Sequence, residues 1–177
     1  MDNLGSMFVK KDGFPGKYGK YFLSKEVLTE YIVSNIPILH SVGLEVSELT
    51  ENKIKISAPL FDNRNHYGSA FGGSIATLGI VAGWAILTYK IKEENIPATL
   101  VIKNSNTEYL LPIKDNFYAE VSIEEIDWKK LKTEFISKRK AGIEVTAYII
   151  SEGKVCARQK SVYVCLNPKI IYPTKNP

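Results

Sequence analysis

An apolar run from Ile75 to Leu87 constrains the fold of this chain more than any other feature. A membrane-spanning helix needs about 20 nearly unbroken apolar residues, and this run is interrupted by polar and glycine positions and lies between segments of strand periodicity. The run therefore predicts a helix that is buried on most sides in a protein core. Its small residues favour close packing of a sheet against it, since each glycine costs about 1 kcal/mol of helix propensity: Ala76, Gly79, Ala82 and Gly83.

The segments on both sides of this run show the alternation of apolar and polar residues that is typical of strands. Before it, residues 44–47 and 53–60 predict a hairpin with a turn at 50–52. After it, strands are predicted over 99–110, 117–123, 143–149 and 155–166. Helical spacing predicts two further helices, one from an N-cap at Ser24 to about Pro37 and a short one carrying Trp128, Leu131 and Phe135. The chain is therefore predicted to be α+β, with an antiparallel sheet of about six strands around a long central helix.

Alternation along 99–110 predicts which side chains share a face of that strand. Leu100, Ile102 and Glu108 would lie on one face, together with Asn104, Asn106 and Leu110. A carboxylate on a face with so many apolar neighbours would be partly desolvated, which raises its pKa. The alternative is that this end of the strand is exposed to solvent.

Length and composition set the broad class. A chain of 177 residues fits one domain, which we place at 23–167, with a loose N-terminal arm at 1–22 and a loose tail at 168–177. The net charge is +4 and the lysines are scattered among acidic residues, so nucleic-acid binding is not indicated. The N-terminus lacks the order of a secretion signal, and we expect a cytoplasmic protein whose Cys156 and Cys165 form no disulfide.

Several short motifs resemble the thioesterase domain found at the C-terminus of YiiD-type proteins, within the hot-dog-fold thioesterase superfamily. The residues that carry the likeness are Ala58-Pro59-Leu60, Asn63-x-Asn65-His66, Ala70-Phe71-Gly72-Gly73-Ser74, Ala82-Gly83-Trp84 and Tyr109-Leu110-x-Pro112. The resemblance implies a single hot-dog domain that binds a small-molecule acyl thioester of coenzyme A or acyl carrier protein. It also implies a homodimer or dimer of dimers whose site is built from both subunits. No cofactor is expected beyond the coenzyme A of the substrate.

The loop before the buried helix contains the candidate catalytic groups. Gly72, helped by Gly73, could offer backbone N–H groups at the helix start to the thioester oxygen, or the glycines could serve packing alone. Asn65 could hold water or the thioester oxygen, or form an Asx turn. His66 could be a general base, or a surface histidine. The matching motifs make these the expected substrate-binding residues: Asn63, Phe71, Gly73, Ser74 and Tyr109.

One departure from the best-understood hot-dog thioesterases stands out. They carry an acid on the central helix eight positions after the glycine that corresponds to Gly72, and this chain has Ile80 there. Asp62, His66 and Glu108 are the candidate substitutes. The chemistry could thus be hydrolysis with an unconventional base, with Asn65, Gly72, His66 and Glu108 catalytic, or binding of an acyl group without turnover.

Other activities receive less support from the sequence. The dehydratase branch of the fold pairs a histidine with a helix acid, and neither His40 nor His66 occupies that place. The two histidines and two cysteines show no metal-ligand spacing, so no metal is expected. The run Lys138-Arg139-Lys140 could contact the phosphates of coenzyme A, or be a solvated surface.

Overall fold

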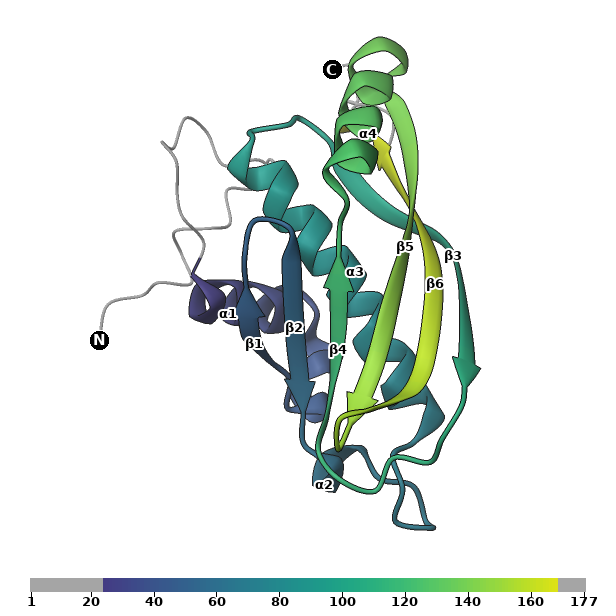
Figure 1. The fold of residues 1–177 in the computed structure, drawn as a ribbon. Helices are drawn as coiled ribbons and strands as arrows, with labels where there is room; N and C mark the ends of the chain where they lie inside the picture. Colours follow the sequence, from purple (N-terminus) through teal and green to yellow (C-terminus); the bar gives the residue numbers. More distant parts are fainter. Residues whose placement is uncertain (1–23, 169–177) are drawn as a thin grey trace, which may run out of the picture.

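The computed structural model describes residues 24–168, so the arm and tail predicted at the two termini lie outside the described residues except for Pro168. The structure contains these elements in chain order (Figure 1): α1 Lys25–Asn35, the 3₁₀ helix η2 Pro37–Val42, β1 Glu45–Leu49, β2 Lys53–Ala58, α2 Leu60–Asn63, α3 Gly72–Glu93, β3 Thr99–Tyr109, β4 Phe117–Ser122, α4 Glu125–Lys138, β5 Lys140–Ser151 and β6 Lys154–Leu166. Every predicted strand and helix is present. The short η2 and α2 were not predicted.

The six strands form one antiparallel sheet in the order β1-β2-β4-β5-β6-β3. The sheet curves around α3, which crosses its concave face, while α1 lies beside β1 (Figure 1). The predicted α+β class and central helix are therefore confirmed. Among residues 24–168, the long β3 and the short β1 are the two edges of the sheet, so each has a neighbouring strand on one side.

Helix α3 has 22 residues and is buried along most of its length. By length and composition it could cross a membrane, but 72% of its most apolar window is buried inside the molecule, as in a core helix. A Cβ atom at Gly79 would collide with the Gln159 side chain, and one at Gly83 would lie 2.5 Å from the Tyr163 hydroxyl. The predicted packing role of these two glycines is confirmed.

Local signals set the ends of the smaller elements. The Ser24 hydroxyl accepts the Val27 N–H at 3.3 Å and caps α1, as the sequence predicted. The β5–β6 hairpin turns through Glu152 and Gly153, which both have positive φ angles of 48° and 71°. Such a two-residue turn matches the twist of the flanking strands.

Cys165 is buried with a free thiol, and burial raises its pKa to about 11.

The predicted faces of β3 are wrong beyond its first residues. Ile102 pairs with Tyr163 and Asn104 pairs with Val162, so Lys103 is an extra residue that forms a bulge. Because side chains alternate, one inserted residue exchanges the two faces for the rest of the strand. Ser105, Thr107 and Tyr109 consequently face α3, and Glu108 faces outward.

Candidate active site

The loop between α2 and α3 is closed at its base by Asn63. This side chain is 2% exposed and donates from Nδ2 to the carbonyl oxygens of Val42 and Pro59, both at 2.8 Å. The Asn63 backbone carbonyl accepts the Phe71 N–H at 2.7 Å, and the Ala70 N–H donates to the Ile113 carbonyl at 2.9 Å. The expectation that Asn63 binds substrate is not supported, since its amide N–H donors already have backbone partners. Asn63 holds the start of α3 in place.

Asn65 organises the tip of the loop. Its Oδ1 accepts the N–H groups of Tyr67 at 2.9 Å and Ser69 at 3.3 Å, and its Nδ2 donates to the Ser69 hydroxyl at 3.0 Å. Gly68, with φ of 78°, lets the chain turn back here. This is the Asx turn that the sequence left open as an alternative. The structure therefore accounts for Asn65 as a loop-shaping residue, and a contact with substrate stays a prediction.

The first turn of α3 keeps its N–H donors free. Phe71 is the N-cap and supplies no capping side chain. Within residues 24–168, no hydrogen bond reaches the N–H groups of Gly72, Gly73 or Ser74. These donors point along the positive end of the helix dipole, which favours a negative or strongly polarised oxygen. The helix start can therefore polarise a carbonyl group.

Aromatic side chains flank these free donors. The Tyr109 hydroxyl donates to the Gly72 carbonyl at 2.9 Å, and its side chain is 55% exposed. Phe71 is 57% exposed and its ring lies so close to Gly73 that a Cβ there would collide with it. Tyr109 is therefore not part of the core. Both rings are placed to contact a ligand at the helix start, together with exposed Leu110 and Leu111.

The candidate bases differ in position. Glu108 lies on the outer face, where its carboxylate pairs with Arg158 at 2.6 Å and its side chain is 51% exposed. Of the two alternatives for Glu108, the solvent-exposed one holds, because the β3 bulge turns its side chain away from α3. His66 is exposed and packs against Tyr67, with ring centroids 3.8 Å apart and the ring planes tilted by 41°. Asp62 is exposed on α2, so neither group occupies a buried site.

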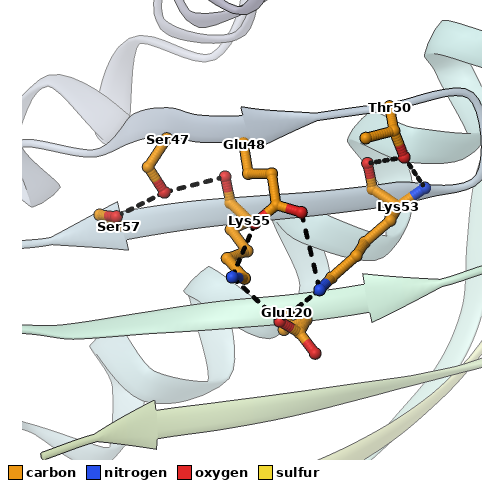
Figure 2. A network of polar contacts seen from close by, with 7 residues as sticks. All are labelled: Ser47, Glu48, Thr50, Lys53, Lys55, Ser57 and Glu120. Atoms are coloured by element: carbon orange, nitrogen blue, oxygen red, sulfur yellow. Dashed lines mark hydrogen bonds and ion pairs between the residues drawn. The ribbon is translucent and has the colours of Figure 1, made fainter.

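The outer face of β1, β2 and β4 is a solvated polar surface. Figure 2 shows its network, in which the carboxylates of Glu48 and Glu120 are shared by Lys53 and Lys55 at distances of 2.7 to 3.6 Å. The hydrogen bond from Lys55 lowers the pKa of Glu48. A hollow of about 320 Å³ lies farther along this face, between β4, β5 and the start of α4, and is lined by carboxylates such as Glu120 and Glu144. Neither feature resembles a binding site for an anionic thioester.

Within one chain, the basic run that could contact coenzyme A lies far from the start of α3. Lys138 ends α4 and pairs with Glu134 at 2.9 Å, and Lys140 begins β5. Figure 1 places both at the opposite end of the sheet from the start of α3. A contact with phosphates therefore stays a prediction.

Three polar residues of the inner sheet face were not predicted from the sequence as candidate site residues. Thr107, Gln159 and Tyr163 form hydrogen bonds along one flank of α3. A glutamine at an inward position of an apolar strand is an unusual signal and could have singled out Gln159. The β3 bulge hid Thr107, because simple alternation assigned it to the other face.

Solved structures of other proteins share this fold. A protein of unknown function from Chlorobaculum tepidum TLS is 27% identical, with a TM-score of 0.74 over 79% of this chain and 92% of that chain. A structure described as a putative thioesterase from Shewanella oneidensis is 24% identical, with a TM-score of 0.70 over 78% of this chain and 94% of that chain. One from Pseudomonas aeruginosa, described as a probable thioesterase, is 21% identical, with a TM-score of 0.75 over 84% and 99%. The fold is that of the hot-dog thioesterases.

Membership of a particular family within this class follows from the sequence match. The family described as "Putative thioesterase (yiiD_Cterm)" matches residues 25–167, which include every strand and α1 to α4. The chain belongs to this family. The resemblance read from the short motifs is confirmed.

Proposed function

We propose that this protein is a cytoplasmic hydrolase of acyl thioesters, with coenzyme A or acyl carrier protein as the thiol. The observation that carries the proposal is the set of free N–H groups at Gly72, Gly73 and Ser74, which stand at the start of a buried helix in a chain of thioesterase family. An oxygen held there would be polarised by the helix dipole. The exposed rings of Phe71 and Tyr109 would flank the thioester.

The reaction follows from this placement. Water adds to the carbonyl carbon, and the negative charge that develops on the oxygen is stabilised by the Gly72 and Gly73 N–H groups. The intermediate collapses by breaking the carbon–sulfur bond, and the thiolate takes up a proton to give the free thiol and a carboxylic acid. His66 and Asp62 remain the candidates for the base that accepts the proton of water.

We also propose that two copies pair through β3. This edge strand has 11 residues, and its free side carries unpaired backbone groups beside exposed Ile102, Leu110 and Leu111. Long exposed edges of this kind are usually covered, because they pair readily with other strands. Antiparallel pairing would bring the β3 end of one copy toward the β3 start of the other, so each site would border both subunits. Sedimentation that finds only monomer at micromolar protein contradicts this pairing.

A binding module without turnover is the second candidate. Ile80 stands where related enzymes have a carboxylate, and Glu108 points away from α3 toward Arg158. A protein with free carbonyl-binding donors and no base could hold an acyl thioester intact. The two candidates share the binding step and differ only in the release of thiol.

The first experiment measures steady-state release of free thiol from short, medium and long acyl-CoAs. Turnover by the wild type supports the hydrolase, and binding without turnover supports the module. Asn65→Ala should lower kcat/KM about tenfold to a hundredfold, because the loop that presents the helix start loses its Asx turn.

Glu108→Gln is the matched control, since it removes only an exposed ion pair on the outer face. Its kcat/KM should stay within twofold of the wild type. A large loss in Glu108→Gln with none in Asn65→Ala would contradict the placement of the site at the helix start.

A further inference from the structure

The Tyr109 hydroxyl joins the edge strand β3 to the first turn of α3. It lies 2.9 Å from the Gly72 carbonyl oxygen, and it must be the donor because a carbonyl oxygen can only accept. A Cβ atom at Gly72 would lie 3.4 Å from the same hydroxyl, so the tyrosine packs directly on the helix backbone. This bond therefore ties the sheet to the helix where the free N–H groups begin.

The end of β3 holds the backbone of Tyr109 in place. Tyr109 pairs with Ala157 of β6, which is 0% exposed. The next two residues, Leu110 and Leu111, both donate their N–H groups to the Cys156 carbonyl, at 2.8 and 3.0 Å. The sheet thus fixes the residue, although its ring is more than half exposed. Its hydroxyl offers the helix start a support that does not depend on the α2–α3 loop.

The Gly72 carbonyl belongs to the same peptide unit as the Gly73 N–H. Because that unit is planar and trans, its C=O and N–H point in opposite directions, and a bond that orients one orients the other. A peptide between two glycines meets little steric hindrance to rotation, so an outside contact restrains it usefully. Hydrogen bonds in a chain also strengthen one another, by about 10–30% per bond. A donor on the Gly72 oxygen therefore makes the Gly73 N–H a stronger donor.

The neighbouring peptide units have no such support. Three units carry the free N–H groups, and they join Phe71 to Gly72, Gly72 to Gly73 and Gly73 to Ser74. Within residues 24–168, only the middle unit has a carbonyl that accepts from outside the helix. The Phe71 carbonyl accepts from Ile75 of α3 itself, at 3.1 Å. Tyr109 thus singles out the Gly73 N–H among the three free donors.

We propose that Tyr109 is a positioning residue that acts on the thioester through the Gly72–Gly73 peptide. This inference rests on the proposed hydrolase function. The Tyr109 hydroxyl orients and polarises the peptide, and the Gly73 N–H donates to the thioester carbonyl oxygen, where negative charge develops as water adds. The gain grows as that charge forms, so it stabilises the transition state more than the bound substrate. Tyr109 keeps its proton throughout.

The first test compares two tyrosines that make the same kind of bond. Tyr109→Phe removes the hydroxyl and keeps the ring, and should lower kcat for acyl-CoA about fivefold to tenfold, with KM within about twofold. The loss is smaller than the roughly hundredfold loss on removing a whole oxyanion donor, because the Gly73 N–H is weakened and not deleted. Thermal melting verifies that each variant is folded.

Tyr163→Phe is the matched control. The Tyr163 hydroxyl donates to the Ile80 carbonyl at 2.7 Å, but the N–H of that peptide unit, on Val81, lies inside α3 and not at its free end. Its kcat should stay within about twofold of the wild type. An unchanged kcat in Tyr109→Phe, a loss confined to KM, or equal losses of kcat in both variants would overturn the proposal.

A series of fluorinated tyrosines at position 109 separates polarisation from a merely structural bond. Ring fluorination makes the phenol a stronger donor with little change in size. Single-turnover rates are measured at a pH at which every phenol of the series is protonated. The rate should rise with the acidity of the phenol, because a stronger bond to Gly72 makes the Gly73 N–H a stronger donor. A rate that does not follow the acidity would assign Tyr109 a merely structural role.

Binding measurements separate failure of this inference from failure of the proposed function. If the wild type turns over and Tyr109→Phe matches it, the Tyr109 role is wrong and the hydrolase stands. If the wild type binds acyl-CoA without turnover, the hydrolase is wrong, and the infrared carbonyl band of the bound thioester judges Tyr109. That band should lie at higher frequency in Tyr109→Phe than in the wild type and Tyr163→Phe, and equal bands would overturn the role. Absence of both turnover and binding would overturn both proposals.

Discussion

The polar groups at the two ends of α3 differ in whether they have hydrogen-bond partners. At the last turns, Lys90 is 3% exposed, and its ammonium group donates to the Glu51 carbonyl at 3.1 Å and to Asn52 Oδ1 at 2.5 Å. Burial lowers the pKa of this lysine. The Trp128 indole N–H donates to Glu94, which also pairs with Lys132 at 2.7 Å. At the first turn, the N–H groups of three residues have no partner within residues 24–168.

This contrast separates the structural end of the helix from the functional one. A buried polar group without a partner costs about 1–3 kcal/mol, and the closed end satisfies most of its groups internally, with Glu93 Oε1 an exception within residues 24–168. An open end can leave donors free, because solvent or a ligand satisfies them. The aromatic side chains follow the same division: Trp128 is 1% exposed, whereas Phe71 and Tyr109 are more than half exposed.

The largest expected effect lies at the closed end. Trp128→Ala removes a fully buried side chain and its bond to Glu94, and should lower the free energy of unfolding by about 3–5 kcal/mol. Urea unfolding measures this loss. Because Trp128 bonds to Glu94 at the C-terminal end of α3, away from the first turn, the thiol release per folded molecule should not change. A selective loss of turnover would break the division between the two ends.

Two glycine substitutions sharpen the comparison at a smaller scale. Gly83→Ala should cost about 1–3 kcal/mol, because its Cβ meets the hydroxyl of Tyr163, which is 0% exposed and bonded to Ile80. Gly73→Ala should cost less than about 1 kcal/mol, since the exposed Phe71 ring can move aside. The activity should respond in the opposite order, because the moved ring crowds the free N–H groups. Unfolding and thiol-release assays on both variants test this reversal.

A further effect of comparable size is a loss of stability at alkaline pH. Burial raises the pKa of Tyr163 to about 12, above its ordinary value near 10, so the folded state holds this proton more tightly than the unfolded state. The stabilisation is complete below pH 10 and is lost as pH rises toward 12. At pH 11, relative to pH 8, the tyrosine alone should lower the free energy of unfolding by about 1 kcal/mol.

The matched variant is Tyr163→Phe, which has no ionisable group. It should lose less stability than the wild type between pH 8 and pH 11, by that same amount. An equal loss in both proteins would show that other groups, such as Cys165, control the alkaline behaviour.

Much of the fold was predictable because its signals are local. The Ser24 cap, the positions of the strands and the packing glycines of α3 each depend on neighbours in the chain, and all were predicted correctly. The candidate site was predicted less well. Gly72, Gly73, Phe71 and Tyr109 do gather at the helix start, but Asn63 is closed off and Glu108 faces outward.

The sequence by itself determined the α+β class, the order of elements and the buried central helix, because the period of apolar residues follows directly from strand and helix geometry. Only the tertiary structure decided which side chains face α3. One inserted residue, Lys103, exchanges the faces of β3, and nothing in the alternation marks where a strand will bulge. Strand pairing therefore brought Thr107 to Gln159 and turned Glu108 to Arg158, since a bulge arises from the register of two strands and not from one strand alone.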